Sequence, residues 1–304
     1  MSEDIPFNRT LELAPGVVDH VVPGVRRMLA DNPGPFTFKG TFSYIIGRRK
    51  VAIIDPGPLD APHIAALLDA VRGETVTHII ITHTHRDHSP GAAPIRAATG
   101  APTFGEGPHR PSRPLFIGET KRLDAGGDTD FVPDHRVADG DVIEGDDWAL
   151  EAIATPGHTA NHMAFALKGT EVLLSGDHVM GWSTSIVAPP DGSMSDYMAS
   201  LDRLAARPET VYLPGHGDVI HNASDFVARY IAHRRGREAS ILHRLGKGET
   251  DISGLVRAVY IGLDPRLAGA AALSTLAHLE HLTARGLVAT DGAPSISGRY
   301  RLPP

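Results

Sequence analysis

The sequence contains no cysteine. This absence excludes disulfide bonds, thiolate nucleophiles and cysteine-ligated zinc, so any metal site must be built from histidine, aspartate and glutamate. The sequence also lacks long apolar runs, and its first residues, MSEDIPFNRT, do not have the charged-then-apolar pattern of a secretory leader. We therefore expect a cytoplasmic protein that does not cross a membrane.

An excess of positive charge is missing as well. The 304 residues carry a formal net charge of -7, which argues against an extensive nonspecific grip on nucleic acid but leaves room for a local basic groove. The apolar fraction of 41% and the charged fraction of 21% are typical of a soluble globular protein. The length fits one large domain or a main domain with a smaller partner.

Apolar patterning predicts strands at residues 36–47 (FTFKGTFSYIIG), 50–57 (KVAIIDPG) and 76–83 (VTHIIITH), with a helix between the last two. Residues 195–208 (SDYMASLDRLAARP) predict an amphipathic helix, for which Ser195 is the expected N-cap. The stretch from Gly105 to Gly140 is rich in proline, glycine and aspartate and has no period. A loop of that length is usually functional or mobile.

The C-terminal part changes character. A long basic helix is predicted at residues 224–248, two more helices at 251–262 and 268–288, and a short strand pair after them. This outline is that of a winged helix, so we predict a catalytic domain at 1–245 and a winged-helix-like domain at 246–304. The second domain has six basic and five acidic residues. It therefore lacks the basic stripe of a DNA-reading domain, and we expect it to be structural or to form a wall of the active-site cleft.

One short stretch, HTHRDH, concentrates potential metal ligands. His83 and His85 lie two apart at the end of an extended segment, so their side chains point the same way and can reach one ion. Asp87 and His88 follow where the chain turns. A lone histidine is most often structural, but packing does not account for four potential ligands at this density.

Three further candidates each follow an apolar run and stand beside glycine: His158, Asp177 and His216. Glycine at these places allows a sharp turn at the rim of a sheet. Five histidines and two aspartates suit two zinc ions, and a carboxylate such as Asp177 can bridge a pair of metals. Two metals a few ångströms apart can hold a hydroxide at neutral pH and polarise the bond under attack, so the set predicts a hydrolytic centre.

The order of these residues resembles the metallo-β-lactamase superfamily. The resemblance implies an α+β fold, a four-layer αββα sandwich with the metals at one edge, and two zinc ions as cofactors, with iron or manganese as alternatives. It implies that Asp177 bridges the metals, that Asp87 orients or deprotonates the attacking water, and that Asp55 supports the ligands. The implied ligands are His83, His85 and His158 for one metal and Asp87, His88 and His216 for the other.

The complete ligand set is similar to that of glyoxalase II-like thioesterases and RNA-processing nucleases, whereas true β-lactamases commonly replace some ligands. Stretches such as PGHTANHMAFAL and LSTLAHLEHLTARGLV resemble a subgroup that has a C-terminal winged helix and includes mitochondrial endoribonucleases. We predict a metal-bound hydroxide acting on a small ester or thioester. Cleavage of single-stranded RNA, di-iron oxidoreduction and a vestigial site in a nucleic-acid-binding regulator are the alternatives, and a homodimer is the expected assembly if the chain associates.

Oxidoreductases of the superfamily usually have a glutamate where this chain has His85, which favours hydrolysis. The stretch GTFSY (40–44) departs from the GTNTY of relatives and leaves the substrate preference open. We expect His109 and His135 to be exposed loop histidines, and His178 to face the pocket wall. His162 fits a supporting and a packed position equally well, and Thr84 and Arg86 are candidates to face the substrate. The remaining cations are expected to be solvated: Arg110, Arg113, Lys121 and those between His233 and Arg244.

Overall fold

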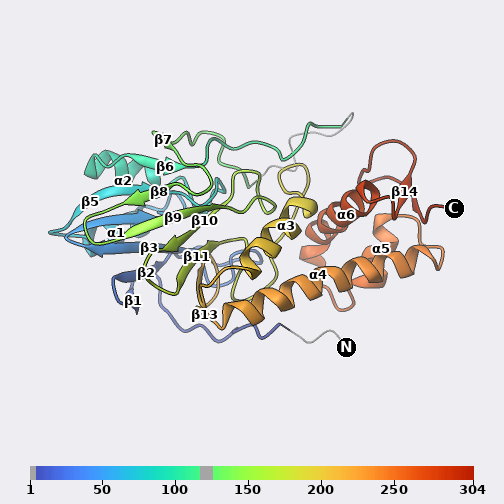
Figure 1. Ribbon diagram of the computed structural model, residues 1–304, viewed down its shortest axis with the longest axis horizontal. Helices are drawn as coiled ribbons and strands as arrows, with labels where there is room; N and C mark the ends of the chain where they lie inside the picture. The colour runs from blue at the N-terminus through green and yellow to red at the C-terminus, as the bar shows by residue number, and fades with distance from the viewer. Residues whose placement is uncertain (1–4, 117–125) are drawn as a thin grey trace.

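A computed structural model describes residues 5–116 and 126–304. Two β-sheets pack face to face (Figure 1). The first sheet has seven strands in chain order, antiparallel as far as the fourth and parallel from there on. They are β1 (Val18–Val22), β2 (Val25–Leu29), β3 (Phe42–Arg48), β4 (Lys50–Ile54), β5 (Thr75–Ile80), β6 (Thr103–Gly105) and β7 (His135–Arg136).

The second sheet has the order β13-β12-β11-β10-β9-β8. Its neighbours pair antiparallel, except for the parallel pair of β11 and β12, which α3 (Met194–Ala205) connects. The strands are β8 (Val142–Glu144), β9 (Ala149–Ala154), β10 (Met163–Leu167), β11 (Val172–Gly176), β12 (Val211–Pro214) and β13 (Ile220–His221).

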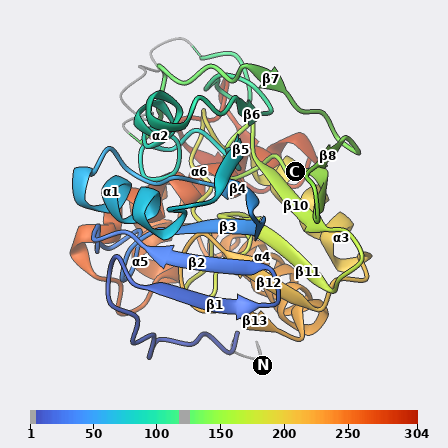
Figure 2. The same ribbon diagram turned by 90° about the vertical axis from the view of Figure 1, so that its left-hand side faces the viewer.

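Helices cover the outer face of each sheet (Figure 2). On the first sheet Ile45 and Ile53 pack against α1 (Ala61–Ala70) and α2 (Ala92–Thr99), and on the second Leu173 packs against α3 and α4 (Ala223–Leu245). Between the sheets lies a third apolar layer that includes Phe42 and Phe165. Strands buried on both faces are apolar throughout, which explains the continuous runs in the sequence. The predicted αββα sandwich is confirmed.

The C-terminal residues form a winged helix of α5 (Ile252–Val259), a 3₁₀ turn (Pro265–Leu267), α6 (Ala268–Ala284), β14 (Ala289–Thr290) and β15 (Tyr300–Arg301). Its core contains Leu255, Leu279 and Tyr300 together with Ile241 from the end of α4. The beginning of α4 packs on the second sheet instead, through residues such as Tyr230. One helix therefore belongs to both cores, and the division at 245/246 stays a prediction.

Two local predictions were wrong. The strand expected at 36–47 begins only at Phe42, because Gly34 and Phe38 exchange backbone hydrogen bonds of 3.2 and 2.9 Å that close a tight turn. The N-cap of α3 is Ser193 rather than Ser195, since the Asp196 amide donates to the Ser193 hydroxyl at 3.3 Å. Within the described residues, no helix has the length and apolarity needed to cross a bilayer.

The cap assignment can be tested with two substitutions. Ser193→Ala should lower the free energy of unfolding by about 0.5–2 kcal/mol, because an amide of the first turn loses its acceptor. Ser195→Ala, at an exposed position, should change it by less than about 0.5 kcal/mol. Urea denaturation of both variants measures the difference, and a larger loss at Ser195 would contradict the assignment.

Candidate metal centre

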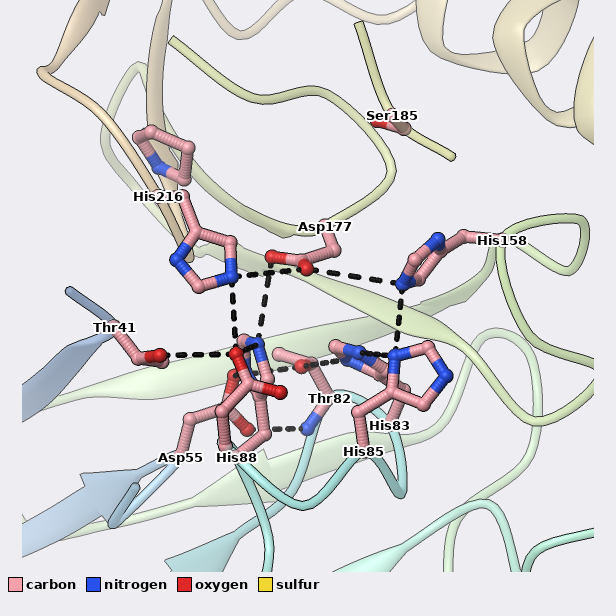
Figure 3. A network of polar contacts seen from close by, with 12 residues as sticks. Thr41, Asp55, Thr82, His83, His85, His88, His158, Asp177, Ser185 and His216 are labelled. Carbon is pink, nitrogen blue, oxygen red and sulfur yellow. Dashed lines mark hydrogen bonds and ion pairs between the residues drawn. The ribbon is translucent and has the colours of Figure 1, made fainter. Parts of the chain in front are cut away.

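The seven predicted ligands come together at one edge of the sandwich. All of them except Asp87 are labelled in Figure 3. Each lies in a loop that follows the carboxyl end of a strand, namely β5, β9, β11 or β12. The parallel pairs β4–β5 and β11–β12 bring such ends to a common edge, which is where α/β proteins usually build their sites. The ligand atoms fall into three overlapping groups: His83, His85 and His158; Asp87, His88 and His216; and His83, His88 and Asp177.

In the first group three imidazoles face one another. His85 Nδ1 lies 3.0 Å from His83 Nε2 and 3.0 Å from His158 Nε2. The opposite nitrogens are anchored: His85 Nε2 donates to Asp191 at 3.1 Å, and His158 Nδ1 donates to the Ile186 carbonyl at 2.6 Å. A neutral imidazole that donates through one nitrogen has a lone pair on the other. Two facing lone pairs repel, and a shared proton or a metal ion between them relieves the repulsion. Nitrogens on one tetrahedral zinc ion are about 3.3 Å apart, so the spacing also fits a metal.

The second group combines imidazoles with a carboxylate. His216 Nε2 lies 3.1 Å and His88 Nε2 lies 3.4 Å from Asp87 Oδ2. Their other nitrogens are also anchored, since His216 Nδ1 donates to the Gly40 carbonyl and His88 Nδ1 to Asp55, both at 2.9 Å. Such outer partners fix the ring orientation and leave the inner nitrogen available to a metal.

Asp177 lies between the two groups. Its Oδ2 is 3.2 Å from His216 Nε2 and 3.7 Å from His158 Nε2, while its Oδ1 is 3.5 Å from His88 Nε2. The carboxylate of Asp177 is therefore close to imidazole nitrogens of both groups. Within the described residues, both Asp177 Oδ1 and His88 Nε2 are buried without a hydrogen-bond partner. Buried polar atoms are rarely left unsatisfied, so the donor set fits a pair of cations.

Glycines make room for this cluster. A Cβ on Gly215 would lie 2.4 Å from Asp177 Oδ1 and 2.7 Å from His88 Cε1. Gly176 has a φ of +49°, and a Cβ there would lie 2.6 Å from His162 Nε2. Both positions therefore require glycine, because a side chain would push into the ligands.

Several buried residues support the ligands from behind. Asp55 accepts hydrogen bonds from the Thr82 amide at 2.7 Å and the Thr82 hydroxyl at 2.6 Å, in addition to the one from His88. His162 Nε2 accepts from the Asp177 amide at 3.1 Å, which gives it a supporting position. The Thr41 hydroxyl donates to Asp87 at 3.0 Å. Of the unusual GTFSY stretch, therefore, Thr41 touches the centre, whereas the next residue, Phe42, is buried in the core.

In the metal-free protein the pKa shifts differ even within one group, since burial acts to lower the pKa of His85 but the hydrogen bond and charge of Asp191 raise it. Burial and the neighbouring imidazoles hold the pKa of His83 well below its usual range, and burial together with His85 lowers the pKa of His158 to about 4. Burial also acts to lower the pKa of His216, but the charge of Asp177 and hydrogen bonds to both carboxylates raise it to about 10. A proton on His216 therefore neutralises a carboxylate where a metal would otherwise do so.

The other sequence candidates have varied positions. His109 was predicted to be exposed, and this was wrong: its side chain is 2% exposed, and its Nδ1 lies 3.0 Å from the Thr84 hydroxyl. Thr84 is consequently buried, whereas Arg86 lines the cavity above the ligands.

His135 is exposed on β7, as expected. Buried His178 packs at a tilt against Tyr197 of α3, with 4.3 Å between the ring centroids, and it does not line the cavity over the ligands.

The predicted loop cations make ion pairs. Arg110 pairs with Glu106, and Arg113 pairs with Glu280 of α6, so the loop is tied to the winged helix. Lys121 lies outside the described residues. Sequence reasoning missed Asp191, which anchors His85 and is 6% exposed. Its only signal was the turn-forming sequence PPDG.

A cavity of about 510 Å³ opens over the ligands. Its lining includes five residues of the predicted ligand set, namely His85, Asp87, His158, Asp177 and His216. The opposite wall is apolar and includes Ala270 and Leu273 of α6, so the winged helix faces the site. This volume is in the usual range for a site that binds a small molecule.

Comparisons with known proteins agree with this geometry. The family model described as "Metallo-beta-lactamase superfamily" matches residues 36–216, more than half of the chain. The chain belongs to the metallo-β-lactamase superfamily. A second model, "Beta-lactamase associated winged helix domain", matches residues 252–297. Membership in this superfamily confirms the predicted class of enzyme, a metal-dependent hydrolase.

Two curated relatives align over much of the chain. "Beta-lactamase-like protein 2 homolog" of Caenorhabditis elegans is 34% identical over 236 residues, which are 76% of this chain and 74% of the relative. "Thioesterase pkgB" of Emericella nidulans is 30% identical over 237 residues, which are 76% of this chain but only 62% of the relative. A crystal structure of a metallo-beta-lactamase family protein from Thermus thermophilus superposes with a TM-score of 0.74 at 24% identity, covers 93% of this chain and 99% of that one, and shows the shared fold.

Asp55 provides a test of the supporting contacts in this superfamily member. Its φ of 48° is tolerated by asparagine, so Asp55→Asn keeps the backbone while removing the charge and one acceptor oxygen. We expect a 10- to 100-fold loss of zinc affinity, measured by competition with a chelating dye. Asp31→Asn, at an exposed position, is the control and should change nothing. Unchanged affinity in Asp55→Asn would show that the ligands do not depend on this carboxylate.

Metal binding should be linked to pH. The pKa of His216 in the metal-free fold, about 10, exceeds the ordinary 6.5, so its proton stabilises that fold fully below pH 6.5 and progressively less as pH rises toward 10. A metal must displace this proton. Its apparent affinity should therefore rise between about pH 6 and 8, by up to about tenfold per pH unit for each proton released. Calorimetric titrations in buffers of different ionisation enthalpy count the protons, and an affinity independent of pH would contradict the linkage.

Proposed function

We propose that the chain hydrolyses an acyl thioester at a centre of two metal ions. The observation that supports this most strongly is the convergence of five imidazole nitrogens and two carboxylates whose outer atoms are anchored. Zinc fits the nitrogen-rich donor set, and iron or manganese would fit it too. The proposed ligands are His83, His85 and His158 for one ion, Asp87, His88 and His216 for the other, and Asp177 for both.

When bound, two such ions lower the pKa of water and polarise a carbonyl group. The protein side chains supply position and proton transfer. Asp87 is 24% exposed at the side chain and lines the cavity, so its carboxylate can meet a water molecule there. The hydroxyl of Thr41, itself held by Asn32 at 2.9 Å, fixes the orientation of Asp87. Asp87 is thus suited to orient the attacking water and accept its proton.

The cavity favours an acyl group over a nucleic acid strand. Its wall opposite the ligands has apolar side chains, Phe36, Met180, Ile186 and Leu273 among them. Within the described part of the chain, Arg86 is the only arginine or lysine that lines it. Single-stranded RNA sites combine a basic groove with stacking aromatics. A relative named as a thioesterase supports the same choice of substrate.

The proposal predicts two metals per chain and thioester hydrolysis that depends on Asp87. Asp87→Asn should lower kcat for a short acyl thioester by about 100-fold or more, because the proton acceptor is lost. Thr41→Val should lower it less, since it disturbs only the orientation of Asp87. His135→Ala, at an exposed histidine of β7, should be neutral. Elemental analysis and thiol-release assays measure these quantities.

Three results would count against the proposal. A chain purified without chelators that contained no metal would exclude the dinuclear centre. Full thioesterase activity in Asp87→Asn would remove the assigned role of that residue. Cleavage of a short labelled RNA or a phosphodiester, with no thioester hydrolysis, would replace the substrate class.

A further inference from the structure

A second cavity, of about 450 Å³, adjoins the metal cavity. Four residues line both of them: Phe36, Met180, Ile186 and Ala270. The remaining walls of the second cavity come from α4, the winged helix, the segment 182–186, and two residues nearer the N-terminus, Arg9 and Pro35. A single extended ligand could therefore occupy both cavities, with one end at the metal centre and the other between the sandwich and the winged helix.

The second cavity is strongly basic, although the chain as a whole is acidic. Its lining includes Arg9, Arg234, Arg237 and Arg266, against one carboxylate, Asp264. That carboxylate already pairs with Arg266 at 2.7 Å. Burial lowers the pKa of the adjacent His233 to about 4, so this imidazole is neutral and adds no charge. The excess positive charge has no counterpart in the described lining, which points to an anionic ligand.

Arg234 is the innermost of these cations. Its residue is only 4% exposed, and it lies over the ring of Tyr197 with one Nη donating to the Ser185 carbonyl. Its Nε is buried without a hydrogen-bond partner, and no acidic side chain pairs with the guanidinium among the residues described. A buried charge without a counter-ion destabilises the fold, so a group that supplies negative charge here is expected.

Arg237 stands three residues further along α4, on the same face of the helix. It is partly buried, stacks on Tyr260 with its guanidinium carbon 4.0 Å from the ring centroid, and donates to the Val259 carbonyl at 2.8 Å. It too has no acidic partner within the described ranges. The stacking and the carbonyl contact fix the guanidinium plane while leaving other N–H groups to a ligand. Paired, oriented guanidinium groups suit phosphate better than a single ammonium would.

We propose that this second cavity binds the phosphate end of a phosphopantetheine thioester, whose acyl end lies at the metal centre. The inference rests on the proposed thioester hydrolysis and adds a chemical class of substrate to it. Phosphopantetheine joins a thiol to a phosphate through a flexible neutral arm. The thiol end would lie at the metal site, the arm between the apolar residues that line both cavities, and the phosphate at the arginines. Coenzyme A and acyl carrier proteins both present this group.

The test uses the zinc-loaded chain and two thiols, coenzyme A and phosphate-free pantetheine, with 4′-phosphopantetheine as the link between them. All three offer the same thiol to the metals. Because coenzyme A also adds an adenosine, the gain of phosphopantetheine over pantetheine reports the phosphate alone. Coenzyme A should bind at least tenfold more tightly, and Arg237→Gln should weaken it about 10- to 100-fold while changing pantetheine less than about twofold. Calorimetry or thermal-shift titration gives these constants.

The matched control is Arg235→Gln on the same helix. Arg235 is exposed, faces Asp202 at 3.7 Å and does not line the cavity, so its loss should change neither constant. If Arg237→Gln melts at a much lower temperature, Arg9→Gln at an exposed lining position repeats the measurement with little risk to the fold. Equal affinity for coenzyme A and pantetheine, or equal losses for both thiols in the lining variant, would overturn the proposal.

Kinetics distinguish coenzyme A from an acyl carrier protein as the carrier of the phosphate. They also distinguish failure of the phosphate site from failure of the proposed thioester hydrolysis. A rise in KM that Arg237→Gln causes only with an acyl-coenzyme A, or only with an acyl carrier protein, identifies the carrier. If coenzyme A binds as expected but no thioester is hydrolysed, the phosphate site stands and the proposed function fails. If thioesters are hydrolysed without preference for the phosphate, this inference fails alone. Binding of a short RNA in place of coenzyme A, weakened by Arg237→Gln, would also overturn it.

Discussion

The rest of the site depends on how the imidazole rings at this edge are held by groups on their far sides. His85 Nδ1 faces two other imidazole nitrogens at 3.0 Å, and all three rings have an acceptor on the far side. These acceptors prevent the rings from turning away. The inner nitrogens therefore stay close together, where they can share a proton or bind a metal ion.

Backbone carbonyls carry much of this constraint, which ties the metal site to the cavity beside it. The Ile186 carbonyl accepts from His158, and the carbonyl of the preceding residue, Ser185, accepts from Arg234. Two adjacent peptide groups therefore join His158 on one side to the buried arginine on the other. The segment that orients His158 is thus also a wall of the basic cavity.

Sequence patterns predicted the residues that converge at this edge better than the groups behind them. The converging residues follow apolar strands, and three of them, His158, Asp177 and His216, also stand beside glycine. Both features can be read locally. The carbonyls of Gly40 and Ile186 cannot, because every residue has one and only the fold decides which faces a histidine. His109 was misjudged for a similar reason, since its loop is polar but folds back to bury the ring against Thr84. The predicted N-cap of α3 was wrong by two residues. Either serine fits the preference for serine at an N-cap, but only Ser193 has the extended backbone of a cap.

The winged helix was predicted from an order of helices and strands, but its position relative to the site required the structure. α4 runs from the second sheet into the core of the winged helix, so both units share one rigid element. Glu238, on the same helix, accepts from His281 at 2.7 Å and from Arg285 at 3.1 Å, which pins α6 beside it. α6 then presents Ala270 and Leu273 to the metal cavity. The winged helix thus forms a wall of the metal cavity, and this role depends on the apolar side chains of its inner face. It does not need a basic stripe on the outer face, which is consistent with the nearly neutral charge of this domain.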